Sequence, residues 1–259
     1  MIKFFRKIRQ NMLSEGKTGK YFKYAIGEII LVVIGILIAL QINNWNENRK
    51  ANTLEKSYYC LLLDDLKQDK QQVDVLKTLV KERISYSNQM ISVIQQDQSD
   101  ATKFGENLRY AIRLAANSFQ PNDATYEDIK SSGNLSIIKD KKIVKALNTY
   151  FKTTDGYTKA IITNFELDFD RLSNFENFIS LGLFNANDEF YKNKIFTEDI
   201  RQQLKEDLPQ FIPKDIKPRL YGTALSIGLN NRRRLELLNL IESEVDNMLR
   251  LLNQKCTNQ

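Results

Sequence analysis

The feature that most constrains this chain is an unbroken apolar run at residues 29–40, in which no side chain is polar. Apolar flanks extend the segment to about 20 positions, the length with which a helix crosses roughly 30 Å of hydrocarbon. Tyr24 and Trp45 stand at its two ends, where interfacial aromatic side chains are found. We therefore expect a transmembrane helix at residues 25–45, embedded in a lipid bilayer.

Charge is distributed unevenly about this segment. Residues 1–24 carry seven basic side chains and one acidic side chain. Because the whole chain has 38 basic and 32 acidic residues, positions 25–259 hold 31 of each. Lys and Arg are retained on the cytoplasmic side of a membrane, so we expect a cytoplasmic tail at 1–24 and an exported domain at 46–259. The net charge of +6 then reflects topology, and no nucleic-acid partner is expected.

A cleavable signal peptide is the alternative interpretation of the apolar segment. Such a peptide has a shorter basic region, and a pair of small residues at a cleavage site follows its apolar stretch. Residues 38–42 (Ile-Ala-Leu-Gln-Ile) contain no such pair. We therefore favour an uncleaved signal anchor.

Beyond residue 46 the apolar pattern is helical. Apolar side chains recur in steps of three and four from Leu54 to Ile94, as in an amphipathic helix. No Pro or Gly occurs at 36–100, so we expect the transmembrane helix to continue into this one without a break. Further helices are expected at 101–119, from 123 or 124 to a C-terminal cap at Gly133, at 139–181, within 186–207 and at 221–252, with a loop at 209–218. The predicted fold is all-α, an elongated antiparallel bundle of three to four long helices with coiled-coil-like packing.

Two stretches of the sequence resemble one known family. The N-terminal stretch contains the strings MIKFFRKIR, GKTGKY, AIGEI and IGILIALQINNWNE, and the second stretch is TYEDIKSSGNL at 125–135. Both are similar to an uncharacterised family of single-span membrane proteins from Gram-negative bacteria. The resemblance implies an inner-membrane protein with a cytoplasmic N-terminus and a helical periplasmic domain. It implies no activity, because the family is catalogued as a domain of unknown function.

Glu28 is the most prominent candidate for a functional residue, because a carboxylate inside a span is costly unless something compensates it. One interpretation is contact with a partner, or proton coupling as in the single-span partners of ion-driven membrane complexes. The simpler interpretation is that Glu28 lies one helical turn inside the interface, where Tyr24 and Lys20 or Lys23 can pair with it.

Gly35 and Ala39 form a small-xxx-small pair within the span. Small residues at this spacing let two membrane helices approach closely, so homo-oligomerisation through the span is a further possibility.

Cys60 and Cys256 are the two cysteines of the chain, and they are too isolated to form a metal motif. In an exported domain they face an oxidising compartment. A disulfide would form if the last helix runs back toward the membrane; otherwise the two remain free, partly buried thiols.

The 259 residues include no histidine. This absence excludes Ser-His-Asp and Cys-His catalysis, His-containing zinc sites and the Glu-x-x-His di-iron pattern, because each needs an imidazole. No G-x-S-x-G signature is present either. We therefore expect no catalytic residue, no cofactor and no metal site, and we expect that the protein is not an enzyme.

Other charged clusters are expected to be structural. The acid pairs Asp65/Asp69, Glu166/Asp170 and Glu242/Asp246 have basic neighbours, and residues 232–234 (Arg-Arg-Arg) suit a solvated face with salt bridges. Asp69 alone falls on the apolar stripe, which predicts a buried pairing with an arginine.

These observations predict a membrane-anchored interaction or scaffolding protein of the cell envelope, with an envelope protein as its partner. The alternatives are a periplasmic ligand-sensing bundle that signals through a partner, and a single-span partner of an ion-driven complex through Glu28. A polar pocket in the bundle would favour sensing, whereas an exposed apolar patch would favour a protein partner.

Overall fold

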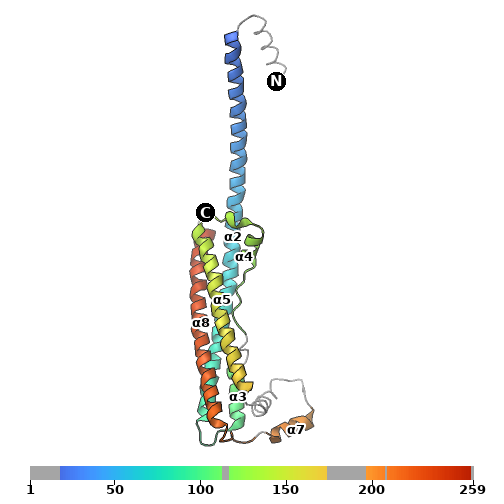
Figure 1. Cartoon of the computed structure of the whole chain (residues 1–259), viewed down its shortest axis with the longest axis vertical. Coiled ribbons are helices and arrows are strands. Elements are labelled where there is room, and N and C mark those ends of the chain that lie inside the picture. Colours follow the sequence, from blue (N-terminus) through green and yellow to red (C-terminus); the bar gives the residue numbers. More distant parts are fainter. Residues whose placement is uncertain (1–17, 113–116, 174–196, 208, 258–259) are drawn as a thin grey trace. The chain divides into compact units, whose positions relative to one another are not determined.

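The computed structural model describes residues 18–112, 117–173, 197–207 and 209–257. The elements, in chain order, are α2 (Thr18–Ile94), α3 (Ala101–Ile112), α4 (Ala124–Ser131), the 3-10 helix η1 (Asn134–Ser136), α5 (Lys141–Ser173), α7 (Glu198–Asp207) and α8 (Lys217–Thr257) (Figure 1). No strand forms within these ranges, and the predicted all-α class is confirmed. The chain divides into two units, Met1–Lys56 and Ser57–Gln259.

The first unit contains the N-terminal part of α2. α2 is one helix of 77 residues, so the predicted continuity between the apolar segment and the amphipathic helix is confirmed. The large apolar side chains of residues 29–40 are all exposed, Leu31 to 74% of its surface. Among the described residues, α2 is the one helix long and apolar enough to span a membrane. Transfer of such an apolar surface from water into hydrocarbon is favourable, so this part of α2 is suited to the interior of a bilayer.

In the second unit, the remainder of α2 packs against α5 and α8, and the fourth column of the bundle is composite. This column consists of α3, the non-helical residues 117–123 and α4. Contacts along the bundle fix the directions. Asn230 on α8 bonds Asn164 on α5, and Lys255 bonds Asp140, so these two helices are antiparallel. In chain order, α2, the composite column, α5 and α8 alternate in direction. This is the up-down-up-down bundle arrangement, in which neighbours along the chain are neighbours in space.

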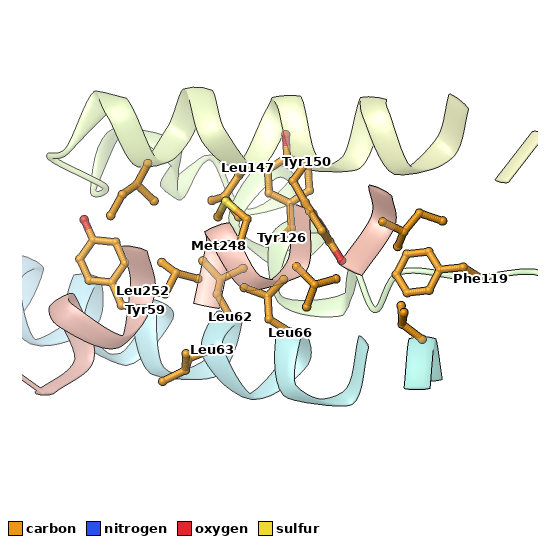
Figure 2. Packing of buried hydrophobic residues seen from close by; sticks show 14 of the residues in the cluster. Tyr59, Leu62, Leu63, Leu66, Phe119, Tyr126, Leu147, Tyr150, Met248 and Leu252 are labelled. Carbon is orange, nitrogen blue, oxygen red and sulfur yellow. The ribbon is translucent and has the colours of Figure 1, made fainter. Parts of the chain in front are cut away.

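Two clusters of apolar side chains form the core of this unit. Figure 2 shows the larger cluster, in which Leu62 and Leu66 of α2 face Leu147 of α5 and Met248 of α8. The second cluster, around Met90, Phe104 and Ile227, joins α2, α3 and α8 near the opposite end. Burial of each large side chain stabilises the fold by about 1.5 to 3 kcal/mol, so these stripes are sufficient reason for the helices to assemble.

Aspartates begin two of the helices. The N–H of Lys103 donates to the carboxylate of Asp100 at 2.9 Å, and the N–H of Lys142 donates to Asp140 at 3.0 Å. Each carboxylate satisfies an N–H that has no partner inside its helix. Just after the C-terminal end of α4, Gly133 has φ 73°, the left-handed conformation that glycine adopts without strain. Gly133 therefore ends this helix as the sequence predicted.

Several predicted helix boundaries are wrong, among them the end of α8, which lies at Thr257 rather than 252. The helix expected at 101–119 does not reach 119, because residues 117–123 are non-helical and α3 ends at Ile112. α8 begins at Lys217 rather than 221, with Pro218 in its first turn. A proline is tolerated there because N–H groups in the first turn of a helix have no partner inside the helix. Two of the expected helices include residues 174–181 and 186–196, and these residues lie outside the described ranges.

Candidate functional site

The predicted site residues of the span lie on the N-terminal part of α2. Gly35 has open space around it, and a Cβ placed there would meet no atom within 4 Å. Ala39 is exposed and Glu28 is partly exposed. Gly35 and Ala39, four positions apart, present an accessible small-residue surface on one side of the helix.

Cys60 and Cys256 are bonded to each other in the structure, with Cα atoms 5.1 Å apart. The bridge joins α2 to the last turn of α8. Next to it, Lys255 forms a salt bridge of 2.9 Å with Asp140 at the start of α5. The same end of the bundle is thus tied by one covalent and one ionic contact, across a sequence separation of 196 residues.

Asp69 is buried, but it does not pair with an arginine as the sequence predicted. Its carboxylate instead accepts from the Tyr150 hydroxyl at 2.6 Å and from the backbone N–H of Asn122 at 2.8 Å. Burial raises the pKa of Asp69 to about 6, while these two hydrogen bonds act in the opposite direction. The prediction failed because the non-helical segment 117–123 passes this point and supplies an N–H where an arginine was expected.

Asp65 and Gln72 bind the same stretch of chain. The N–H of Thr125 donates to Asp65 at 3.2 Å, and the N–H of Gln120 donates to Gln72 at 2.7 Å. On its other side, Phe119 accepts a hydrogen bond of 3.1 Å from the Thr158 hydroxyl. The hydrogen bonds from Asp65, Asp69, Gln72 and Thr158 to this stretch form what we call the polar ladder. The polar ladder replaces the backbone hydrogen bonds of a helix around residues 117–123, and its role is structural.

The acid pair Glu242/Asp246 is also paired across the bundle. Lys70 lies 2.8 Å from Glu242 and 3.0 Å from Asp246, and Lys77 bonds Glu242 as well. Hydrogen bonds from Lys70 and Lys77 hold the pKa of Glu242 below its usual range. Within the described part of the chain, no group of three or more acidic, cysteine or histidine residues could hold a metal ion.

A small cavity lies between α3, α5 and α8 at the end of the bundle farther from the disulfide. It has a volume of about 20 Å³, roughly one water-sized group. Its walls are mainly apolar, and its polar lining consists of Asn164, Asp168, Asn230, Asn231 and Arg234. Several buried polar groups of the described residues therefore converge on this cavity.

Arg234 is the unusual member of this lining. The side chain is only 6% exposed, and its buried Nη1 has no hydrogen-bond partner. The nearby carboxylate of Asp168 favours the charged form of Arg234, yet burial outweighs this effect and lowers the pKa of Arg234 to about 10. The guanidinium therefore stays protonated at neutral pH.

The neighbouring polar groups are already engaged. Asp168 accepts from the Ser226 hydroxyl at 3.1 Å and from Arg171 at 3.4 Å. The amide of Asn231 donates to the Ser87 hydroxyl at 3.1 Å and to the carbonyl of Ala111 at 3.0 Å. Among the described residues, the Nη1 of Arg234 is thus left without an acceptor, while its polar neighbours have partners of their own.

A second buried arginine lies close enough to Arg234 for the two charges to repel each other. Arg83 on α2 is 4% exposed. Burial, and then repulsion from Arg234, lower its pKa to about 10, so it too remains a cation at neutral pH. The expectation of a solvated face at residues 232–234 is correct for Arg232 and Arg233, which pair with exposed Glu236, and wrong for Arg234.

The outer face of α8 carries a row of exposed leucines, which we call the α8 leucine row. Its members are Leu225, Leu229, Leu240 and Leu251, exposed to 38, 70, 43 and 41% of their surfaces. At about 100° per residue, spacings of 4, 11 and 11 positions keep all four within about 80° of one another around the helix. Arg233 and Glu236 are exposed between the first and second pairs.

The model of a family of unknown function, DUF6090, matches residues 28–186, more than half of the chain. The chain belongs to this family. DUF6090 thus covers the apolar segment from Glu28, the composite column and all of α5. No curated protein and no solved structure shows significant similarity to the chain.

Sequence reasoning missed the cavity, although one signal for Arg234 was present. Asn231, Arg234 and Leu238 follow the three-and-four spacing of the inward-facing residues of α8, so helical periodicity places Arg234 on the inner face. The run of three arginines obscured this, because a charge cluster is usually solvated.

Proposed function

We propose that this DUF6090 member is a membrane-anchored interaction protein of the bacterial cell envelope. The apolar part of α2 would cross the inner membrane, the basic tail would remain in the cytoplasm, and the helical bundle would lie in the periplasm. The bundle would bind another envelope protein and would act without catalysis. The observation that carries the proposal is the combination, on one helix, of an exposed apolar segment and a cysteine that is bonded to the end of α8.

The disulfide supports the orientation. Disulfides persist in oxidising compartments such as the bacterial periplasm and are rare in the cytosol. The distribution of Lys and Arg, concentrated before the apolar segment, supports the same orientation independently. Two unrelated properties of the chain, one electrostatic and one redox, therefore favour export of the bundle.

Labelling of single cysteines tests this orientation. Ser14→Cys places a thiol in the basic tail, and Ser243→Cys places one on the exposed face of α8. In intact spheroplasts, a membrane-impermeant maleimide should label Ser243→Cys without lysis and Ser14→Cys only after lysis. The reverse order would overturn the orientation, and labelling of both without lysis would show that the spheroplasts leak.

The α8 leucine row supports a protein partner. Exposed apolar side chains that form a seam along one helix are suited to an amphipathic helix laid against them. The charges of Arg233 and Glu236 between the leucines would pair with charges on that helix and set its register. We therefore propose that the partner presents an amphipathic helix to α8.

Photo-crosslinking in intact cells tests the contact. A crosslinking amino acid at Leu229 or Leu240 should yield the same adduct, whereas one at exposed Asp155 on α5 should not. The adduct should also disappear when Leu225→Glu is introduced, because a charge would then lie within the seam. Adducts of equal yield at all three positions, or adducts of the chain with itself, would contradict a helix of another protein.

Ligand sensing is the second candidate function. The cavity supports it, because Arg234, Asp168 and Asn230 converge there from two helices. Such a bundle would need a partner to carry its signal, so sensing and partner binding are compatible. Coupling to an ion-driven complex through Glu28 remains a prediction of the sequence.

A further inference from the structure

The first part of α5 carries positive charges that are not compensated. Residues 141–154 include four lysines and no acid. Lys141 donates to the carbonyl of Ile138. Within the described part of the chain, no hydrogen bond or salt bridge joins the ammonium groups of the other three lysines to an acceptor. These three side chains, all exposed, are called the α5 lysine set: Lys142, Lys145 and Lys152.

The position of the α5 lysine set is unfavourable for the helix itself. The N-terminus of a helix carries partial positive charge, which favours acids in its first turn, and the first turn of α5 contains none. Lys142 and Lys145 are three positions apart, a spacing at which like charges cost about 0.2 to 0.5 kcal/mol. Farther along the same helix, Lys159 pairs with Asp155 at 2.7 Å. Folding of α5 thus gives no reason for three unpaired lysines, and an external partner with negative charge would compensate them.

The register between α5 and α8 places the α5 lysine set beside the α8 leucine row. The two antiparallel helices are joined by contacts whose residue numbers add to 394 or 395, namely Lys255–Asp140, Asn230–Asn164 and Ser226–Asp168. By subtraction from 394, Lys142 is level with residue 252 of α8, and Lys152 is level with residue 242. The α5 lysine set therefore lies alongside the stretch of α8 between Leu240 and Leu251.

The lysines and the leucines also lie on the same side of this helix pair. At about 100° per residue, the three lysines lie about 40, 100 and 120° around α5 from Asn164, in the direction away from buried Ile161. The leucines lie about 60 to 140° around α8 from Asn230, again in the direction away from the core. Because Asn164 and Asn230 contact each other, both sets border the outer side of the α5–α8 contact. A helix laid on the α8 leucine row would have the α5 lysine set along one flank.

We propose that the α5 lysine set binds acidic side chains that flank the apolar stripe of the partner helix, and that these acids face the stretch between Leu240 and Leu251. This inference rests on the proposed function, because it adds a charge pattern to the partner assigned to the α8 leucine row. Three unpaired cations beside an apolar row favour a partner with an acidic flank and disfavour a basic one.

The same charges argue against a second copy of the chain on this face. Two copies anchored in one membrane run parallel, so a two-fold contact here would place the α5 lysine set of one chain against that of the other. Like charges at such a contact are unfavourable. The occupant that fits is therefore an amphipathic helix of a different protein, with acids on one flank.

Photo-crosslinking from Leu240 in intact cells tests the charge pattern. The triple variant Lys142→Glu, Lys145→Glu, Lys152→Glu should lower the yield of the partner adduct about tenfold, because three attractive pairs become repulsive. The control is a triple variant with the same change in net charge on exposed lysines of α2 and α3, namely Lys67→Glu, Lys81→Glu, Lys103→Glu. The control should keep the adduct within about twofold of the wild-type yield.

The outcomes separate this inference from the proposed function. An absence of any wild-type adduct from Leu240 would overturn both. A wild-type adduct whose yield is unchanged by the variant of the α5 lysine set, or is lowered equally by the control, would overturn the acidic flank and leave the contact with the leucines in place.

A conservative variant separates the charge of the lysines from their amines. A carbodiimide joins a lysine amine to a carboxylate in direct contact with it, so wild-type membranes should yield a partner adduct linked through the α5 lysine set. Lys142→Arg, Lys145→Arg, Lys152→Arg should keep the photo-adduct from Leu240 and lose the carbodiimide adduct. A carbodiimide adduct that persists in the arginine variant, or none in the wild type, would show that the α5 lysine set faces no carboxylate of the partner and would overturn the proposal.

Discussion

The hydroxyl of Tyr150 on α5 lies 2.6 Å from the carboxylate of Asp69 on α2, and both side chains are buried. Asp69 also accepts from the N–H of Asn122, so one carboxylate joins two helices and the non-helical segment between α3 and α4. This bond is the centre of the polar ladder that holds residues 117–123 against the bundle. The protonation state of Asp69 therefore affects the stability of the whole unit.

Replacement of Asp69 by Asn should remove a pH-dependent loss of stability. The pKa of Asp69 is about 6 in the folded chain and 3.8 in the reference state, so the folded state binds the proton more tightly. The contribution of this group is therefore fully present below pH 4 and decreases as pH rises through 6. At 1.36 kcal/mol per pKa unit, the wild type should lose about 2 to 3 kcal/mol relative to Asp69→Asn between pH 4 and pH 7. Guanidinium titrations of both proteins measure the difference, and a constant difference across this range would contradict a raised pKa.

Tyr150→Phe should destabilise the fold at neutral pH. The substitution keeps the ring in the core but removes the donor that faces Asp69, which leaves a buried carboxylate with one hydrogen bond fewer. We expect a loss of about 1 to 3 kcal/mol in the free energy of unfolding at pH 7 and a smaller loss at pH 4, where Asp69 is protonated more often. Tyr157→Phe, on the same helix, is the matched control, and equal losses for the two variants would show that the hydroxyl of Tyr150 is not special.

The helices themselves were predictable because their stripes are local. Leu54 to Ile94 and the inward residues of α8 follow helical spacing, and burial of these stripes leaves few alternatives to a bundle. The end of α3 was not predictable in this way. Residues 117–123 leave the helix because Pro121 has no N–H to donate, and because Gln72 and Asp69 accept the N–H groups of Gln120 and Asn122 from about 50 residues away in sequence. Pro121 predicts a break in this part of the chain, but no pattern within the segment identifies the acceptors on α2.

The candidate site was less predictable than the fold for a similar reason. Cys60 and Cys256 could be proposed as a pair because their positions along two helices are set by residue counts. The cavity at Arg234 depends on which side chains fail to fill the space between three helices, and this is a property of packing rather than of sequence spacing. Periodicity places Arg234 inside, but only the structure shows that its Nη1 has no hydrogen-bond partner among the described residues.

Removal of the disulfide should lower stability without loss of helical structure. The bond closes a loop of nearly 200 residues, which in the chain-entropy model corresponds to about 5 kcal/mol as an upper limit. The double variant Cys60→Ser, Cys256→Ser should therefore unfold at lower guanidinium concentration while its circular dichroism remains helical. Reduction of the wild type with dithiothreitol should reproduce the shift. Alkylation of unreduced protein at two sites would show instead that the thiols are free.

Glu242→Gln should destabilise the bundle more than Glu236→Gln. Glu242 bonds Lys70 and Lys77 across the interface with α2, whereas Glu236 pairs with its own helix neighbours at the surface. We expect a loss of about 1 kcal/mol for Glu242→Gln and less than about 0.5 kcal/mol for Glu236→Gln. Because the pKa of Glu242 is depressed, its contribution is present above pH 4.5 and lost as the pH falls through the lowered pKa, so the effects of the two variants should converge on acidification. Equal effects at pH 7 would contradict an energetic role for the cross-helix pairs.

Glu28→Gln should leave membrane insertion and the crosslinks from the α8 leucine row unchanged. Glu28 lies one turn from the start of the apolar segment, where an acid costs much less than at the centre of a bilayer and where lysines and tyrosine are within reach. Glutamine keeps the size and hydrogen-bonding capacity of the side chain and removes only its charge and its ability to carry a proton. The matched variant Val33→Glu places the same acid near the centre of the span and should reduce insertion. Loss of the crosslinked complex in Glu28→Gln, with insertion intact, would show that the acid at position 28 contributes to partner binding or proton coupling.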